Sequence, residues 1–428
     1  YDPCVANAEI NGSQMTVTWH VDDLKVSHAD EKEIDKFANY LRGIYEKAGL
    51  KLTDKRGDVH DYLGMDLDYS TPGVVRISMI KYLDGVLGDF SEDLGNPAPT
   101  PAASHLFKIR DEKDAAKLDA KRAKEFHTKT AQLLFLSARA RRDIQLAVAF
   151  LTTRVKQPDK DDWGKLRRVL KYLKGTRHMK LTLSIDNMST VRWWVDASDR
   201  THEDCKGHTG SMMSLGKGAA ISGSRKIKIN TKSSTESELV ALDDVLPTIL
   251  WTLYFVEAQG YTIEQNLVFQ DNLSTMRLAT NGPLSSSSRT KHIKARYYFI
   301  KDKIDEGEVE LQYCPTEKMW SDVLNKPKQG SPFYEDRYMV MNVPVKYDDE
   351  EERKITHEDL LPQPEDDYNL AFPELKQPNK ASRSVLGDIG NKKGDLASGT
   401  KKVSWSELTR GGEQNRVRSK SGPDSGIV

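Results

Sequence analysis

Four acidic residues stand where the sequence pattern can bring carboxylates together. Asp196 and Asp271 each end a segment rich in β-branched and aromatic residues, which is typical of a strand. Glu238 lies in the first turns of a long apolar stretch that is predicted to be a helix, and Asp322 lies in the last helical segment. If the two strands are neighbours, their terminal carboxylates converge, and such a cluster of hard oxygen ligands suits Mg²⁺. Paired ions in turn suit an in-line attack on a phosphodiester.

The specificity of this pattern comes from the set and not from any one residue. A chain with 64 acidic residues places some of them at strand ends by chance. Four carboxylates in this order, on a strand, a helix, a strand and a helix, are a much more specific signal.

Two other groups could also do chemistry. Asp22 and Asp23 lie at the expected turn between two short extended runs. His202, Cys205 and His208 form a His-x-x-Cys-x-x-His string. The string suggests zinc, but it lacks the fourth ligand of a tetrahedral site, so we do not expect one.

The elements that must position these residues follow from hydrophobic periodicity, turn residues and helix caps. In the N-terminal part we expect strands at 14–21 and 24–27, a helix at 30–49, strands at 62–69 and 74–78, a helix at 79–87, a proline-rich linker at 95–103, and helices at 125–138, 142–154 and 161–174. Further along we expect strands at 191–196, 207–215 and 218–229, a helix at 234–259, a strand at 266–271, a helix at 273–280, a loop at 283–288, a helix at 292–306, a strand at 309–313 and a helix at 316–324. The second series predicts an α/β domain of about 140 residues, which is a normal domain size.

Composition bounds the class of protein. The 428 residues allow roughly two to three domains. Three Cys cannot form a disulfide framework, so we expect an intracellular protein and not a secreted one. The longest apolar stretch, 239–258, is interrupted by Asp243, Asp244, Pro247 and Glu257, so we expect no membrane span and no membrane partner. The chain opens Tyr-Asp-Pro-Cys, without Met or a signal pattern, which indicates a fragment or a processed product.

The formal net charge of zero conceals segments of unlike character. Residues 100–185 carry about 21 Lys and Arg against about 9 Asp and Glu. In the helix expected at 161–174, basic residues line the face opposite the apolar one; the candidates for binding nucleic acid are Arg167, Arg168, Lys171 and Lys174. This basic face is either a solvated surface or a groove for a phosphate backbone.

Residues 345–428 have a different composition. They contain an acidic run at 348–352 and many Pro, Gly, Ser and Lys, with few aromatic or branched residues. Such a segment cannot bury enough apolar area to offset the entropy of ordering, so we expect a disordered tail.

Several short strings carry a resemblance to a known family. Between 190 and 330 they are Trp-Val-Asp-Ala-Ser (194–198), Lys-Ser-Ser-Thr-Glu-Ser-Glu-Leu-Val-Ala-Leu (232–242), Gln-Asp-Asn-Leu-Ser (270–274), Arg-Thr-Lys-His-Ile (289–293) and Ser-Asp-Val-Leu-Asn-Lys-Pro (321–327). Upstream they are His-Val-Asp-Asp-Leu (20–24), Tyr-Leu-Gly-Met-Asp (62–66), Ser-Ala-Arg-Ala-Arg-Arg-Asp-Ile (137–144) and Arg-Val-Leu-Lys-Tyr-Leu-Lys-Gly-Thr (168–176). The first set resembles the ribonuclease H domain of copia-type long-terminal-repeat retrotransposon Pol polyproteins. The second resembles the reverse transcriptase palm box and the region that joins polymerase to nuclease.

The resemblance implies a fold and a division of the chain. The fold is α/β, with a ribonuclease H-like mixed sheet and flanking helices. The regions are the C-terminal part of reverse transcriptase, with a palm remnant and thumb, at 1–94, a linker and basic helical connection at 95–185, the ribonuclease H-like domain at 190–330, and the disordered tail at 345–428.

The resemblance also assigns roles to the nuclease residues. Asp196, Glu238, Asp271 and Asp322 would be the catalytic residues and would hold two Mg²⁺ or Mn²⁺ ions. Glu236 competes with Glu238, but the two lie about 200° apart around a helix and cannot both face one site.

Three further residues receive weaker assignments. Asp22 and Asp23 would be the remnant of a polymerase site. The family's box has Tyr where this chain has His20, and a further palm Asp would precede Tyr1, so we expect no primer extension by this chain alone. His292 precedes a helix, and we expect it to cap the backbone, contact nucleic acid or act in catalysis.

The function implied is metal-dependent hydrolysis of the RNA strand of an RNA–DNA hybrid. The partners would be nucleic acid and the rest of the Pol polyprotein, in a cytoplasmic particle or the nucleus. The alternatives are an inactive retroelement remnant that only binds nucleic acid, and a DNA-directed nuclease of the same fold.

Overall fold

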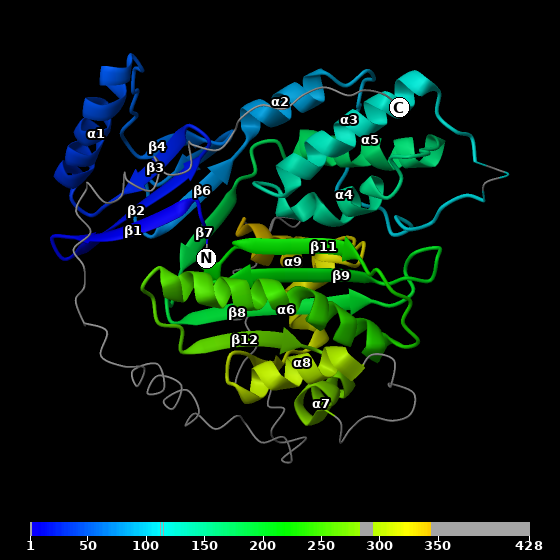
Figure 1. The fold of residues 1–428 in the computed structure, drawn as a ribbon. Helices are drawn as coiled ribbons and strands as arrows, with labels where there is room; N and C mark the ends of the chain where they lie inside the picture. The colour runs from blue at the N-terminus through cyan, green and yellow to red at the C-terminus, as the bar shows by residue number, and fades with distance from the viewer. Residues whose placement is uncertain (1, 112, 114, 283–293, 344–428) are drawn as a thin grey trace, which may run out of the picture. The chain divides into compact units, whose positions relative to one another are not determined.

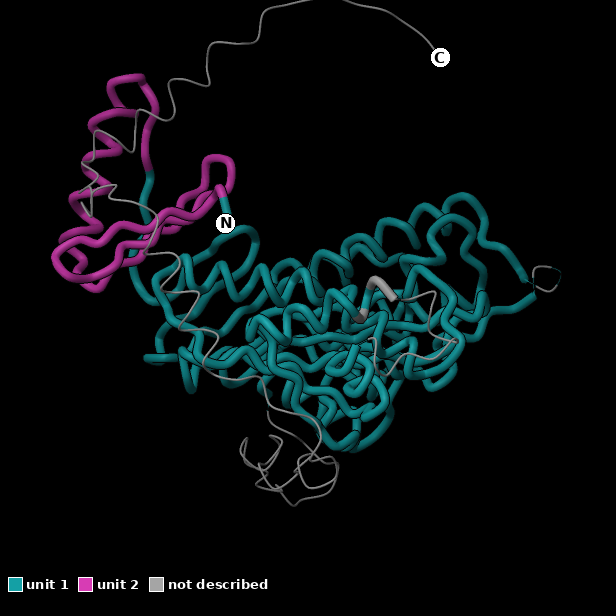
Figure 2. Tube along the Cα trace, turned by 60° about the horizontal axis from the view of Figure 1, so that its bottom comes forward, with its two compact units in different colours: residues 1–2, 53–382 teal, residues 3–52, 383–428 magenta. Residues whose placement is uncertain are grey.

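The computed structural model describes residues 2–111, 113, 115–282 and 294–343 (Figure 1). These residues divide into two compact units, 3–52 and 53–343 (Figure 2). The expected loop at 283–288, His292 and the tail at 345–428 lie outside the described residues.

The smaller unit is a three-stranded antiparallel sheet with one helix. Its elements are β1 (Val5–Ile10), β2 (Ser13–His20), β3 (Asp23–Ser27) and α1 (Glu31–Tyr45), with the strands in the order β1-β2-β3. The predicted hairpin and helix are confirmed, and β1 is an additional strand. Asn11 and Gly12 both have positive φ, as a tight two-residue hairpin turn requires, and Asp30 caps α1 by accepting from the Lys32 N–H.

The larger unit contains a five-stranded antiparallel sheet that the sequence predicted only in part. Its strands are β4 (Val59–Tyr62), β5 (Met65–Asp68), β6 (Val74–Ser78), β7 (Leu181–Ile185) and β10 (Gly216–Lys217), in the order β10-β7-β6-β5-β4. The single strand expected at 62–69 is wrong, because Leu63 and Gly64 have positive φ and turn the chain into the hairpin β4–β5. The strands β7 and β10 were not expected, and they join one sheet across the predicted divisions at 94/95 and 185/190.

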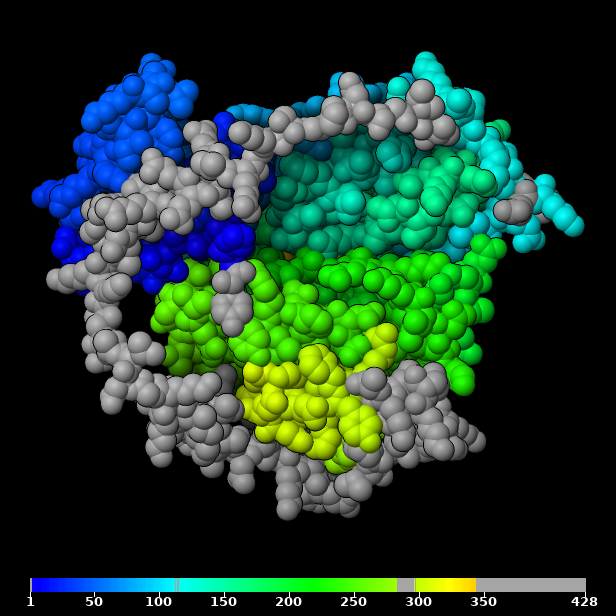
Figure 3. Space-filling model, in the orientation of Figure 1, coloured from blue at the N-terminus to red at the C-terminus, as the bar shows by residue number. Residues whose placement is uncertain are grey.

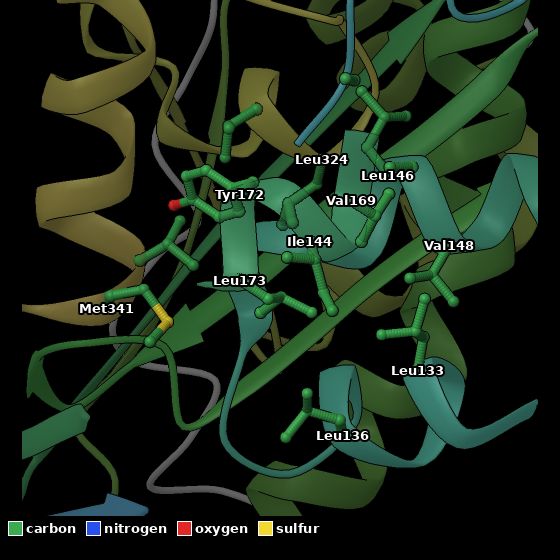
Figure 4. Close-up of a cluster of buried hydrophobic side chains, with 14 of the residues drawn as sticks. Leu133, Leu136, Ile144, Leu146, Val148, Val169, Tyr172, Leu173, Leu324 and Met341 are labelled. Carbon is green, nitrogen blue, oxygen red and sulfur yellow. The ribbon is translucent and has the colours of Figure 1, made fainter. Parts of the chain in front are cut away.

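Four helices of the larger unit pack against one another. They are α2 (Ile80–Gly88), α3 (Ala120–Ser137), α4 (Gln145–Thr152) and α5 (Lys160–Gly175), so the predicted helices are confirmed with shifted ends. Asp159 and Asp162 form a reciprocal capping box that starts α5. The apolar face of α5 enters a core in which Val169 and Leu173 lie near Leu324 and Met341 from much later in the sequence (Figure 4).

The second sheet is mixed. Its strands are β11 (Ile221–Lys226), β9 (His208–Ser214), β8 (Thr190–Ser198), β12 (Gln265–Gln270) and β13 (Glu310–Tyr313), in the order β11-β9-β8-β12-β13. The first three are antiparallel, while β8, β12 and β13 are parallel. The predicted mixed α/β architecture is therefore confirmed, and a sheet specifically of ribonuclease H type stays a prediction.

Successive side chains of β8 point to opposite faces of the sheet and pack in two different hydrophobic cores. Val191, Trp193 and Val195 pack with α6 (Ser234–Ala258) and α8 (Lys294–Asp305), whereas Trp194 belongs to the core that contains the helices α2 to α5. Figure 3 shows α8 in yellow at the surface of this unit. The helix α7 (Leu273–Asn281) follows β12 directly.

The helix α6 is, by length and composition alone, long and apolar enough to cross a membrane. The sequence, by contrast, predicted no membrane span here, because acidic residues interrupt the apolar stretch. In the structure it packs along the second sheet, where Leu239, Leu242 and Leu246 are buried.

The chain after β13 differs from the expectation. The helix expected at 316–324 is two short 3₁₀ helices, η5 (Thr316–Lys318) and η6 (Trp320–Leu324), and a further helix, α9 (Ser331–Met341), follows. The buried side chains Phe333, Val340 and Met341 join the core of the larger unit. The larger unit therefore continues past residue 330 to the last described residues.

Phe333→Ala should lower the free energy of unfolding of the larger unit by about 3–5 kcal/mol, because its buried ring packs edge-on against Tyr172 and its loss leaves a cavity. The matched control is Phe299→Ala on α8, where the ring is 40% exposed and the expected loss is about 1 kcal/mol or less. Urea unfolding measures both, and equal losses would show that α9 is not part of the cooperative core.

Candidate metal centre

Three carboxylates meet at one edge of the mixed sheet. The parallel register pairs Trp194 of β8 with Phe269 of β12, and Asp196 and Asp271 each follow two residues later. The carboxyl ends of the two neighbouring strands thus bring both side chains to the same edge. Glu238 reaches the same point from α6, and one oxygen of each of the three residues lies within 4.8 Å of the others. Among the described residues this is the one group of three or more such side chains that could hold a metal ion.

The structure separates the two glutamates that the sequence left as competitors. Glu236 turns back to the helix start, where its carboxylate accepts from the Lys232 N–H at 2.8 Å. Glu238 lies in the carboxylate group, and its Oε2 accepts from the Ala197 N–H of β8 at 3.2 Å. Glu236 therefore caps α6, and Glu238 faces the cluster.

Burial and mutual repulsion control protonation at this cluster. Burial, together with the charges of Asp196 and Asp271, raises the pKa of Glu238 well above its ordinary value. Burial and Asp196 likewise raise the pKa of Asp271, against the Thr316 hydroxyl that donates to its Oδ2 at 3.0 Å. The surroundings of Glu238 and Asp271 therefore disfavour their ionised forms.

Asp196 behaves differently because it has a cation beside it. Burial opposes its ionisation, yet the Lys326 ammonium at 2.8 Å and the Asn325 amide at 2.7 Å from its Oδ2 hold its pKa well below the usual range. Its other oxygen, Oδ1, is buried and accepts no hydrogen bond. A buried carboxylate oxygen without a donor fits a hard cation, and so does the all-oxygen donor set of the three residues.

Asp322, the predicted fourth ligand, stands outside the group of three. Its side chain on η6 pairs with Lys326 at 2.7 Å and with Lys328 at 3.1 Å. Burial and the neighbouring Asp196 nevertheless raise the pKa of Asp322 to about 7. Neither lysine was predicted to be part of the site, although Lys326 follows Asp322 by four residues, a spacing that often brings opposite charges together.

The His-x-x-Cys-x-x-His string forms a hydrogen-bonded chain. His202 Nε2 lies 3.0 Å from His208 Nδ1, and His208 Nε2 lies 2.8 Å from the Ser224 hydroxyl, which donates to the Leu324 carbonyl. Cys205 is exposed, and the string is not among the metal-binding groups found in the described residues. Burial, with help from Lys226, lowers the pKa of His202 to about 4, and burial with His202 lowers that of His208 to about 3.

The basic residues predicted on α5 are largely engaged within the unit. Arg167 pairs with Glu92 at 3.0 Å, Arg168 donates to the Thr100 carbonyl at 3.1 Å, and Lys174 donates to the Gly95 carbonyl at 3.1 Å. They hold the proline-rich segment against α5, a structural role that the sequence did not reveal. Lys171 makes no hydrogen bond or ion pair with the described residues.

A hollow of about 560 Å³ lies between the segment 101–110 and the start of α5. Its lining includes the basic residues Lys108, Arg110, Lys160, Lys165 and Arg168, together with Asp161 and several apolar residues. Part of this charge is also used internally, since Arg110 pairs with Asp161 and the Lys165 ammonium donates to the Lys108 carbonyl at 2.6 Å.

Asp22 and Asp23 lie in the smaller unit, at the turn from β2 to β3. His20 and Asp23 are the last paired residues of the hairpin, and both carboxylates are exposed. Val21 has a φ of 57° and is exposed, an uncommon conformation for a β-branched residue. The pair does not belong to a group of three metal-binding side chains within the described residues, and its assignment as a polymerase remnant stays a prediction.

Acid should destabilise the larger unit through its two buried histidines. Their pKa values of about 4 and about 3 in the folded chain lie below the value of about 6.5 of an ordinary histidine. At these two sites the unfolded chain therefore binds more protons, so their contribution to the free energy of unfolding is full above pH 6.5 and falls as the pH drops from about 6.5 toward 4. The raised pKa values of Glu238 and Asp322 act in the opposite direction, so urea unfolding across this range measures the histidine contribution as the difference between the parent chain and a histidine variant.

His208→Gln should make that fall shallower, because one of the two sites of extra proton uptake is removed. His127→Gln, at an exposed position on α3, is the matched control and should leave the pH dependence unchanged. Identical slopes in the parent chain and in H208Q would contradict the prediction.

The known proteins to which the chain is similar, as given below, are proteins of transposons. No protein-family model matches the chain. It is 25% identical over 336 residues to the retrovirus-related Pol polyprotein from transposon TNT 1-94 of Nicotiana tabacum, covering 76% of this chain and 24% of that protein. It is 26% identical over 316 residues to the corresponding polyprotein from transposon RE2 of Arabidopsis thaliana, covering 72% of this chain and 20% of that protein. The transposon Ty5-1 protein of Saccharomyces cerevisiae is 26% identical over 234 residues, which are 54% of this chain and 72% of the yeast protein.

The chain thus spans about a quarter or less of the length of the two plant polyproteins it matches. Its homologues are retrovirus-related Pol polyproteins of transposons, and they point in general terms to a function related to the enzymes of a retroelement.

Proposed function

We propose that the larger unit is a metal-dependent nuclease of ribonuclease H type that hydrolyses the RNA strand of RNA–DNA hybrids. The observation that carries this proposal is the meeting of Asp196, Glu238 and Asp271 at the ends of two parallel strands and on the helix that covers them. The similarity to retrovirus-related Pol polyproteins supports the same conclusion, because a retroelement must remove RNA from the hybrid that reverse transcription makes. Residues 1–94 and 95–185 would then derive from reverse transcriptase and its connection to the nuclease.

The residues of the centre fit this chemistry. Asp196, Glu238 and Asp271 would hold Mg²⁺ or Mn²⁺, which supplies an activated water and stabilises the leaving oxygen of a phosphodiester. The chain itself orients the ligands: the Ala197 N–H fixes Glu238, the Thr316 hydroxyl fixes Asp271, and the Asn325 amide fixes Asp196. Such fixed partners keep the carboxylates in place before substrate arrives.

Recognition of the hybrid would rest on backbone shape, 2′-OH groups and phosphates and not on base sequence. The rest of the Pol polyprotein is the partner we propose for the whole chain. An inactive remnant that only binds nucleic acid, or a nuclease that cuts DNA, would each give a different result in the assay below.

The full chain with Mg²⁺ should cleave the RNA strand of a labelled RNA–DNA hybrid, and Asp271→Asn should reduce the rate at least about 100-fold, because a charged ligand of the centre is lost. Asp61→Asn, at an exposed position on β4, is the matched control and should keep the parent rate. No difference between the parent chain and D271N would refute the enzyme proposal. Cleavage of duplex DNA in preference to the hybrid would establish the DNA-directed alternative.

Lys171→Gln should weaken binding of the hybrid and lower the slope of log K against log salt by about one, because one phosphate contact and its released counterion are lost. The control is Lys217→Gln, an exposed lysine on β10. Fluorescence anisotropy at several salt concentrations measures both slopes. A slope in K171Q equal to that of the parent chain would remove Lys171 from the nucleic-acid surface.

A further inference from the structure

A row of alternating charges leads away from the metal centre. The Lys326 ammonium lies 2.8 Å from Asp196 and 2.7 Å from Asp322. The Lys328 ammonium lies 3.1 Å from Asp322 and 2.8 Å from Asp336 on α9. Each lysine thus bridges two carboxylates, and the row connects the centre to the last helix of the unit.

The three acids of this row are deeply buried, with exposed fractions of 1% for Asp196, 3% for Asp322 and 2% for Asp336. Buried carboxylates are costly unless they are paired, so the two lysines are needed for the fold of this segment. The backbone supports the arrangement, because the Lys326 N–H donates to the Asp322 carbonyl at 2.7 Å and closes a tight turn after η6.

The two lysines differ in their freedom to move. The side chain of Lys328 is 19% exposed and ends on Asp336, which is buried in the core side of α9. The side chain of Lys326 is 36% exposed. The side chain of Lys326 is thus the more exposed of the two, and rotation about its own bonds would bring its ammonium into solvent.

The position of the Lys326 ammonium determines whether Asp322 can be a ligand of a divalent ion. A divalent ion shared by Asp196 and Asp322 would have to lie between the same two carboxylates that the Lys326 ammonium now bridges. Two cations cannot occupy that place together, because they repel each other at short range and compete for the same oxygens. In the group Asp196, Glu238 and Asp271, Lys326 forms an ion pair with Asp196 through Oδ2, whereas the buried Asp196 Oδ1 is without a donor. Neither Glu238 nor Asp271 forms an ion pair with a lysine within the described residues.

We propose that Lys326 is a resident cation of the centre. Without nucleic acid, the chain binds one divalent ion through Asp196, Glu238 and Asp271, and the Lys326 ammonium takes the place of a second ion between Asp196 and Asp322. A second ion binds there only when Lys326 swings out. This inference rests on the proposed function only in taking the carboxylate group to bind divalent ions.

The test is Mn²⁺ binding to the full chain, followed by calorimetry and by the loss of the free Mn²⁺ signal in electron paramagnetic resonance. The parent chain should bind one Mn²⁺, and Asp271→Asn should bind it at least tenfold more weakly. Lys326→Gln should bind a second Mn²⁺ or bind the first about tenfold more tightly, since a competing positive charge is gone. Lys326→Arg, which keeps the charge, and Lys217→Gln, which lies elsewhere, should resemble the parent.

A thermal measurement accompanies the titration. K326Q should unfold at a lower temperature than the parent without Mn²⁺, and Mn²⁺ should raise its midpoint more than that of the parent, because the ion replaces the missing charge. K326R should show neither effect. A merely structural lysine would lower the midpoint of K326Q without the larger rescue by Mn²⁺, and that result would overturn the inference.

The outcomes separate the two proposals. If the parent and D271N bind Mn²⁺ equally, or neither binds it, the carboxylate group is not a metal site and both proposals fail. If D271N alone loses binding but K326Q matches or falls below the parent, the inference on Lys326 fails and the metal centre stands. If K326Q does not fold, the number of Mn²⁺ ions bound by the parent chain is still a test. Two Mn²⁺ ions bound by the parent chain without nucleic acid would overturn the inference.

Discussion

The centre depends on the way in which buried carboxylates are compensated around the end of β8. An ionised carboxylate taken out of water costs several kcal/mol unless donors or opposite charges replace the solvent. Asp322 and Asp336 receive that replacement from lysines, so their segment neutralises itself. Glu238 accepts from a backbone N–H and Asp271 from a hydroxyl, and neither forms an ion pair with a lysine within the described residues. Because Asp322 and Asp336 already pair with lysines, Glu238 and Asp271 are the members of the acidic cluster that would gain most from a bound cation.

The groups that stabilise the buried carboxylates come from residues far apart in the sequence. The lysines lie between η6 and α9, and α9 is fixed by its buried apolar face and by the Val340 carbonyl, which accepts from the Ala219 N–H beyond β10. The two cores of the larger unit share β8, whose alternate side chains enter one or the other. Ion pairs through Asp336, Lys328, Asp322 and Lys326 connect α9 to Asp196. The electrostatics of the centre and the stability of the unit are parts of one arrangement.

Local patterns in the sequence were sufficient for the elements that carry the centre. The apolar alternation at 191–196, the strand at 266–271 and the capped helix at 234–259 all correspond to observed elements, and their acidic residues meet as expected. What failed depends on contacts distant in the sequence. The short strands β7 and β10 are defined by pairing with partners from elsewhere in the chain, and α9 has little periodicity of its own. The pairing of Asp322 with Lys328 likewise follows from the turn after η6, whereas the four-residue spacing of Asp322 and Lys326 is a local signal.

Charge is the property for which the sequence was most misleading. A net charge of zero argues against a polyanionic partner, and the basic excess at 100–185 argues for one, but both are counts of residues and not of available charge. On α5, three basic residues are bound to the segment that precedes α3, namely Arg167, Arg168 and Lys174. Lys171 makes no such contact within the described residues, so its charge is the one available to a phosphate. At the centre, acidic residues that lower the net charge would hold a divalent ion, which offsets most of their negative charge and itself offers a positive charge to a phosphate. The attraction of this unit for a phosphate backbone would therefore depend on the bound ion together with the lysines, and the net charge of the chain does not report it.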